Sequence, residues 1–210
     1  MKNRHSIALK MQLLVALAVI ISCVAVTFIS ITLFSGSFAT WIRENLETAS
    51  TGAFSTMEEW KLSLENSAKI FSTHPNLQQA LASDNLVELN KIVDPQVRNL
   101  DADCIFLTDK TGRIVYSSES ASYNRRADSI SCIKSALAGK ESIAIQEFHS
   151  ISYGIFVSEP IYQGMMLVGT VTLGFNLAKN DFISKIQKNY DVDCTIFRGN
   201  TRVSTTLKMK

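Results

Sequence analysis

Residues 11–42 contain no charged side chain. Three basic residues precede this stretch: Lys2, Arg4 and Lys10. Its apolar part, residues 13–34 (LLVALAVIISCVAVTFISITLF), is 22 residues long. A helix of that length rises about 33 Å, which is enough to cross a hydrocarbon layer of about 30 Å. Because basic flanks stay in the cytoplasm, the pattern predicts a cytoplasmic flank over 1–12, a transmembrane helix over 13–34 and an exported remainder.

A cleaved secretory signal peptide is the alternative interpretation of this segment. Such signals have an apolar core of about 7–15 residues, followed by small residues at the cleavage site. Ser35, Gly36 and Ser37 would supply the small residues, but the apolar run is longer than such a core. We therefore expect a retained single-pass anchor in the inner membrane, with the domain that follows on the periplasmic or extracellular side.

The composition is that of a globular protein: 46% of the residues are hydrophobic, 19% are charged, and there are only 3 Pro. Three of the 21 Lys and Arg residues precede the apolar segment, which leaves 18 basic residues against 19 acidic ones outside. A nearly neutral exterior offers no basic surface to nucleic acid, so no nucleic-acid partner is expected.

Residues that hold metals or perform catalysis are scattered along the chain. There is no Cys-x-x-Cys pair, and the 3 His residues lie at positions 5, 74 and 149. No Gly-x-Ser-x-Gly, His-Glu-x-x-His or glycine-rich phosphate loop occurs either. The sequence therefore predicts no catalytic residue, no metal site and no cofactor. Whether Cys104, Cys132 or Cys194 form a disulfide stays open, since all three are exported and their number is odd.

A single apolar stripe follows the predicted membrane span. Its members recur at steps of three or four residues: Phe38, Ile42, Leu46, Ala49, Ala53, Met57, Trp60, Leu64, Ala68 and Phe71. This spacing predicts one long stalk helix that packs on its own domain. A helix this long also suggests a partner helix, so we expect a homodimer through the stalk. The alternative is a long surface helix of a single domain.

Alternating helical and strand-like segments follow the stalk. Thr73, His74 and Pro75 break it, and a shorter amphipathic helix is predicted from Leu77 to near Pro95. Strands are predicted over 104–108, 114–118, 142–148, 152–159 and 166–175. Gly112 suits the first hairpin turn, and helices are predicted over 129–140 and 179–190. This order predicts a compact α+β domain with a five-stranded antiparallel sheet.

The last residues predict one further hairpin, over 193–197 and 201–207. A lone two-stranded hairpin is marginal in water. Its apolar side chains therefore require a core that the remaining residues do not supply: Val192, Ile196, Phe197, Val203 and Leu207. We expect residues 35–190 to form a first domain with its stalk, and 191–210 to be the start of a second, truncated domain.

Three segments resemble the extracellular sensors of bacterial chemoreceptors of the double Cache type. Residues 105–116 (IFLTDKTGRIVY) are similar to the first hairpin of Cache domains. Residues 158–162 (SEPIY) with 168–171 (VGTV) are similar to their closing strand pair. Residues 194–206 (CTIFRGNTRVSTT) resemble the opening of the membrane-proximal unit in methyl-accepting chemotaxis proteins, which usually have Asp where this chain has Asn200. The resemblance implies a PAS-like, membrane-distal Cache domain and the start of a proximal one.

The resemblance also implies a small-molecule site between the sheet and the segment after the second strand, residues 123–128 (YNRRAD). The candidate ligand-binding residues are Tyr123, Arg125, Arg126, Asp128 and Tyr153. Arginine guanidinium groups suit a carboxylate ligand, because their planar fork binds it at two points. The alternative is a solvated loop with weak surface pairs. His149 is either a titrating residue of this site or a turn residue.

The resemblance favours the extracytoplasmic sensing module of a methyl-accepting chemotaxis protein, present as an N-terminal fragment that lacks the signalling domain. One alternative is the Cache sensor of a histidine kinase or a cyclic-nucleotide transducer. Another is a stand-alone, membrane-tethered ligand-binding protein. A pilin-like subunit is less consistent with the sequence, because residues 13–34 lack the glutamate that pilins usually carry.

Overall fold

The computed structural model describes residues 2–98, 100–119, 122–148, 151–179 and 181–207. The chain divides into two compact units, residues 1–50 and 51–210. The first helix, α1 (Lys2–Ser72), is continuous and contributes to both units. The predicted helix over 13–34 and the predicted stalk are therefore parts of one 71-residue helix.

The first unit contains the uncharged segment. In the described part of the chain, one helix is long and apolar enough to cross a membrane, by length and composition. The hydroxyl groups of Ser22, Thr27 and Thr32 donate hydrogen bonds of 2.8, 2.8 and 3.0 Å to the carbonyls of Ala18, Cys23 and Phe28. These polar side chains are thus satisfied within the helix, as an apolar surrounding requires.

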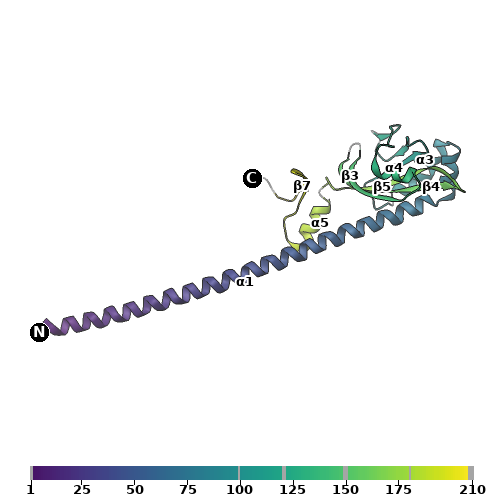
Figure 1. Ribbon diagram of the computed structural model, residues 1–210. Helices are drawn as coiled ribbons and strands as arrows, with labels where there is room; N and C mark the ends of the chain where they lie inside the picture. Colours follow the sequence, from purple (N-terminus) through teal and green to yellow (C-terminus); the bar gives the residue numbers. More distant parts are fainter. Residues whose placement is uncertain (1, 99, 120–121, 149–150, 180, 208–210) are drawn as a thin grey trace. The chain divides into compact units, whose positions relative to one another are not determined.

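The second unit is built on a five-stranded antiparallel sheet with the order β2-β1-β5-β4-β3. Figure 1 labels β3, β4 and β5 of this sheet. The strands are β1 (Cys104–Asp109), β2 (Ile114–Ser117), β3 (Ser142–Phe148), β4 (Ile151–Gln163) and β5 (Met166–Asn176). The predicted fold class, an α+β domain with a five-stranded antiparallel sheet, is confirmed.

One face of the sheet packs against most of the helices. Leu64 and Ala68 of α1 are buried there, together with residues of α2 (Pro75–Ala82), α3 (Leu86–Val97) and α5 (Asp181–Tyr190). Strand residues Ile105, Leu107 and Val157 face this layer. We call this core the helix-side cluster.

The opposite face is covered by α4 (Ser131–Leu137) and the loop before it. The buried residues on this face form a smaller cluster, here called the α4-side cluster: Cys104, Phe106, Ile114, Ala127, Cys132, Ile133, Phe148, Ile151 and Phe156. Because both faces of the sheet are covered, its central strands carry apolar side chains on both sides. Gly139, at φ +81°, follows α4, which is shorter than the helix predicted over 129–140.

The apolar stripe of α1 behaves differently along its length. Leu64, Ala68 and Phe71 are buried in the helix-side cluster, and Ala53, Met57 and Trp60 are partly buried against it. Within the first unit, by contrast, Phe38, Ile42 and Leu46 remain exposed. The prediction that the stripe packs on its own domain is confirmed for its C-terminal half.

The single helix predicted from Leu77 to near Pro95 is wrong. The structure has two helices, because Asp84 takes a φ of +53° and ends the first. Asn85 then caps the second, and its side chain accepts a hydrogen bond from the Glu88 amide at 3.1 Å. Pro95 lies inside α3, near its end, where the loss of one amide donor interrupts little of the helix.

The prediction that the fourth strand ends at Glu159 is also too short, because β4 continues through Pro160 to Gln163. β3 begins at Ser142, opposite Ser158, so Pro160 lies where β4 has β5 as its neighbour and no pairing with β3. Proline is tolerated at such an edge position, because the missing amide removes no bond of the ladder.

The final hairpin forms as predicted, with β6 (Thr195–Arg198) and β7 (Thr201–Thr205) in a separate two-stranded sheet. Its turn contains Gly199 at φ +57°. Phe197 and Leu207 are about half exposed, whereas Val192 and Ile196 are partly buried against the helix-side cluster. The outer apolar residues of this hairpin therefore lack a core in the described chain.

Candidate ligand-binding site

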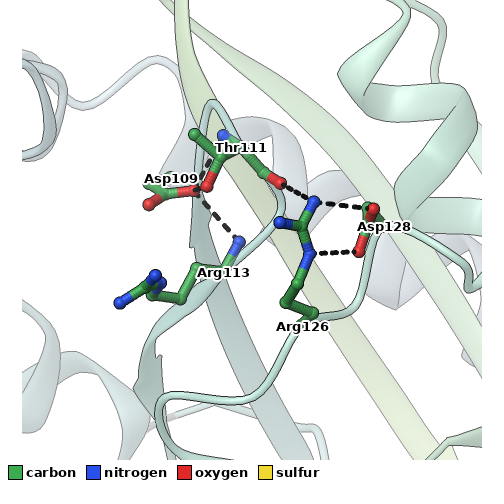
Figure 2. A network of polar contacts seen from close by, with 5 residues as sticks. All are labelled: Asp109, Thr111, Arg113, Arg126 and Asp128. Carbon is green, nitrogen blue, oxygen red and sulfur yellow. Dashed lines mark hydrogen bonds and ion pairs between the residues drawn. The ribbon is translucent and has the colours of Figure 1, made fainter.

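The turn between β1 and β2 provides the frame of the candidate site. The Asp109 carboxylate accepts hydrogen bonds from the Thr111 amide at 2.8 Å, the Thr111 hydroxyl at 2.7 Å and the Arg113 amide at 3.0 Å (Figure 2). Gly112 has a φ of +79°, and a Cβ there would lie 2.7 Å from the Asp128 Cβ. The turn thus needs glycine both for its backbone conformation and for its close approach to the loop before α4.

That loop runs along β2 and is fixed to it by backbone hydrogen bonds. The Ile114 amide donates to the Arg125 carbonyl at 2.9 Å, and the Ala127 amide donates to the Gly112 carbonyl at 2.8 Å. These bonds cover the outer edge of the sheet. They also hold the side chains of Tyr123, Arg125 and Arg126 at the surface, where all three are exposed.

Arg126 and Asp128 form a bidentate pair within this loop. Nε of Arg126 lies 3.1 Å from Oδ1 of Asp128, and Nη2 lies 2.9 Å from Oδ2 (Figure 2). Nη2 also donates to the Thr111 carbonyl at 3.3 Å. The hydrogen bond between the two side chains lowers the pKa of Asp128 and raises the pKa of Arg126. The guanidinium fork of Arg126 is therefore already occupied by a carboxylate of the protein.

Arg125 differs from its neighbour. Its side chain is exposed and forms no ion pair with any residue that the structure describes. Of the two predicted arginines, Arg125 is the one whose guanidinium group is available to an incoming anion without displacing a protein carboxylate.

Tyr153 is not brought together with the other predicted residues. It lies on β4, partly buried against the helix-side cluster, whereas Ala127 of the loop belongs to the α4-side cluster. Tyr153 lies two residues before Ile155 on β4 and therefore points to the same face of the sheet, the one covered by the helix-side cluster. The structure thus groups Tyr123, Arg125, Arg126 and Asp128 on one loop and places Tyr153 elsewhere. Their ligand-binding roles stay predictions.

The space between the sheet and α4 is filled by aromatic rings. Phe148 stacks on Phe106 with ring centroids 4.1 Å apart and on Phe156 at 5.1 Å. Hydroxyl pairs extend this layer along the sheet: Thr108 with Thr170 and Ser158 with Thr172, each at 2.8 Å and fully buried. These groups satisfy one another, so the interior under α4 is packed.

Ser122 is a residue that sequence reasoning missed. Its side chain is fully buried in the loop before α4. Its hydroxyl is the one buried side-chain polar atom without a hydrogen-bond partner among the described residues. An unsatisfied buried hydroxyl costs free energy, and a ligand that bonds to it would recover that cost. No sequence pattern marks this serine, because its burial depends on how the loop folds against the sheet.

Other predicted or nearby groups lie outside this loop. His149 is outside the described residues. Arg198 on β6 forms an ion pair with Glu147 and donates to the Ser152 carbonyl at 3.3 Å, so it ties the final hairpin to the β3–β4 hairpin. The four cysteines are all free in the described chain, and burial raises the pKa of Cys104 and Cys132.

Two cavities lie apart from the predicted residues. One, of about 330 Å³, is bounded by the β1–β2 turn, the β4–β5 turn and the end of α2, including Asp84, Lys110 and Met166. A second, of about 310 Å³, lies between α1 and the edge strand β3, including Met57 and Ile145. Neither touches Arg125, Arg126 or Asp128.

Solved structures share this fold. The sensor domain of the Vibrio cholerae histidine kinase DctB matches with a TM-score of 0.60 at 15% identity, over 79% of this chain and 65% of that domain. The Escherichia coli DcuS sensor domain matches with a TM-score of 0.53 at 20% identity, over 64% of this chain and 97% of that domain. The sensory domain of the Campylobacter jejuni chemoreceptor Tlp3, solved with isoleucine bound, matches with a TM-score of 0.50 at 11% identity. The match covers 78% of this chain and 68% of that domain.

These similarities establish the fold, and the chain spans less than two thirds of the DctB domain. No protein of curated function matches the sequence. One family of sensor domains, dCache_3, described as the double sensory domain of two-component sensor kinases, matches residues 46–210. Because that match covers most of the chain, including the sheet and the final hairpin, the protein belongs to the dCache_3 family of Cache sensor domains.

Proposed function

We propose that this chain is the extracytoplasmic sensing module of a membrane receptor and that it binds a small molecule. The observation that carries the proposal is the family match over residues 46–210, which spans the five-stranded sheet and the final hairpin. The proposal assigns the chain no catalytic step. It gives the chain the role of converting ligand binding into a change that a signalling domain reads.

Two receptor classes fit this module. The chemoreceptor assignment is supported by residues 194–206, which resemble the opening of the membrane-proximal unit in methyl-accepting chemotaxis proteins, and by the fold shared with the Tlp3 chemoreceptor. The sensor-kinase assignment is supported by the description of the family and by the fold shared with the DctB kinase. Both signalling domains would follow a second membrane span, so the sensing chemistry proposed here is common to both.

The proposal places the module outside the inner membrane, with α1 as its single anchor. The uncharged run within α1 and the basic residues before it support this orientation. We expect a periplasm-specific reporter, such as alkaline phosphatase, to be active when it is fused after Lys140. A cytoplasm-specific reporter at the same position should be inactive. Activity of the cytoplasmic reporter alone would contradict the orientation.

The exposed apolar residues at the start of the stalk support a homodimer as part of the proposal. Phe38, Ile42 and Leu46 continue the stripe that the C-terminal half of α1 buries in its own domain, yet they remain exposed. A second copy of α1 would cover them in the manner of helix pairs that bury a repeating apolar stripe.

The ligand we propose is a small molecule with a carboxylate. Arg125 offers a guanidinium group that pairs with no carboxylate among the described residues, and Arg126 would bind a carboxylate if Asp128 released it. Ser122 would supply a hydroxyl from the same loop once the loop opened, because its side chain is fully buried in the structure. The isoleucine bound to the Tlp3 sensory domain carries such a carboxylate.

Replacing Arg125 or Arg126 with alanine is expected to weaken the ligand-induced thermal stabilisation of the full chain in detergent. The screen uses L-isoleucine, acetate and succinate as probes. A saturating ligand at about 100 times its dissociation constant adds about 2.7 kcal/mol, which raises the unfolding midpoint by several degrees. Each alanine variant should lose most of that shift at the same concentration.

Arg98→Ala provides the matched control, because Arg98 is exposed and lies at the end of α3, away from the loop. It should keep the full shift. If both loop variants also keep it, the ligand binds elsewhere. If none of the probes stabilises the wild-type chain, the carboxylate assignment is wrong while the sensor fold stands.

A further inference from the structure

Glu159 is the one charged side chain that is buried in the described part of the chain, at 8% exposure. It lies on β4, two residues from Val157 and two from Ile161, which both belong to the helix-side cluster. Residues spaced by two along a strand point to the same face of the sheet. Its carboxyl group is therefore on the face of the sheet that packs against α1, opposite to the candidate ligand site. Buried carboxyl groups are rare unless a partner compensates for the lost hydration.

The strand register places a second carboxyl group beside it. Ser142 of β3 pairs with Ser158 of β4 in an antiparallel ladder, so the preceding residue, Glu141, stands opposite Glu159. Like charges that face each other across two strands repel. A hydrogen bond between two carboxyl groups requires that one of them keeps its proton, because ionised carboxylates only accept. We call Glu141 and Glu159 the acid pair.

The remaining charged groups around the acid pair come from α1. Glu65 and Lys69 follow Leu64 and Ala68, which are buried in the helix-side cluster, and both act on Glu159 electrostatically. The other elements packed on this face near Glu159, α2 and β5, contain no charged residue. One lysine therefore faces three carboxyl groups at the contact between α1 and the sheet.

The surroundings of Glu159 favour its protonated form. Burial contributes most and raises the pKa of Glu159 to about 7, and the charge and hydrogen bond of Glu141 act in the same direction. Lys69 lowers the pKa, and Glu65 raises it further. Since the free carboxyl group titrates near 4.5, the folded chain holds a proton here that the unfolded chain has released.

We propose that the acid pair is a proton-sensitive contact between the sheet and α1, which is tight in acidic surroundings and weakens as the pH rises toward neutrality. The sign follows from proton linkage. Between pH 4.5 and about 7 the folded state binds more protons than the unfolded state, so the stabilisation is complete below about pH 4.5 and lost as the pH rises through about 7. This device is independent of the proposed ligand site, and α1 is the helix that also carries the predicted anchor.

The test is the unfolding midpoint of the full chain in detergent, measured at pH 5 and pH 8. The unfolding midpoint of the wild type should be lower at pH 8 than at pH 5. Glu159→Gln keeps the shape of the protonated side chain and removes its titration, so its midpoint should fall less than half as far. At pH 8 it should melt about 4 °C above the wild type. Histidines also titrate in this range, and the comparison between variants at each pH removes their contribution.

Two further variants make the result decisive. Glu141→Gln changes an exposed member of the acid pair, so folding is not at risk, and it should also flatten the pH dependence. Glu88→Gln, on the exposed side of α3 beside Lys91, is the matched control and should keep the wild-type fall. The proposal is overturned if Glu159→Gln and Glu141→Gln both retain the full fall, or if Glu159→Gln melts below the wild type at pH 8.

Discussion

Replacing Phe156 with alanine is expected to reduce the free energy of unfolding of the second unit, residues 51–210, by about 3–5 kcal/mol. This is the usual range for a fully buried phenylalanine, and we call residues 51–210 the sensor unit. Phe156 has no exposed surface and stacks on Phe148 at the centre of the α4-side cluster. Two glycines of the sheet make room for its ring: a Cβ at Gly154 or Gly174 would lie 2.9 or 2.5 Å from it. Because the ring is enclosed on several sides, its removal leaves a cavity that the sheet cannot easily close.

The measurement is chemical unfolding of the full chain in detergent, followed by near-ultraviolet circular dichroism. Phe54→Ala is the control, since Phe54 lies on α1 with 66% of its surface exposed. That variant should change the free energy of unfolding by no more than about 0.5 kcal/mol. Equal losses in the two variants would mean that the α4-side cluster is not a packed core in solution.

The strands and turns were predictable because their signals are local. The sheet segments are short apolar runs, and Gly112, Gly164 and Gly199 lie at turns where the backbone φ is positive. Each of these features depends on a few neighbouring residues, which the sequence presents directly. The boundaries of β3 and the start of β5 accordingly agree with the prediction.

The errors arose where the structure depends on distant contacts. The extension of β4 through Pro160 is allowed because the pairing of β4 with β3 stops at Ser158. The sequence around Pro160 gives no sign of where that pairing stops. The break between α2 and α3 was closer to being readable, because Asn85 followed by Glu88 is a recognisable helix start.

The candidate site shows the same division. The pairing of Arg126 with Asp128 joins residues two positions apart, and the sequence already suggested that these charges interact. By contrast, the burial of Ser122 and the opposition of Glu141 and Glu159 follow from strand register and loop packing. Such placements are fixed by tertiary structure, so charge and hydropathy patterns do not reveal them.

Trp60 joins α1 to the sheet and to α5, and Trp60→Ala is expected to cost about 2–3 kcal/mol, less than for a fully buried ring because Trp60 is partly buried. The centroid of its ring lies 4.5 Å from that of Phe175 on β5 and 5.2 Å from that of Phe182 on α5. The Lys185 ammonium group lies 6.0 Å from the same ring, within the range of a cation–π contact. Loss of the ring therefore removes contacts with a strand and a helix at once.

The chain has only one other tryptophan, which makes the comparison direct. Trp41 is 58% exposed on the same helix, within the first unit, so Trp41→Ala should leave the unfolding of the sensor unit unchanged. Trp60→Phe keeps an aromatic ring in place and should recover most of the loss seen with alanine. Circular dichroism is the suitable probe, because each variant alters tryptophan fluorescence. If Trp60→Ala unfolded like Trp41→Ala, the C-terminal half of α1 would be a separate stalk. The expected difference instead makes the C-terminal half of α1 part of the core that it shares with β5 and α5.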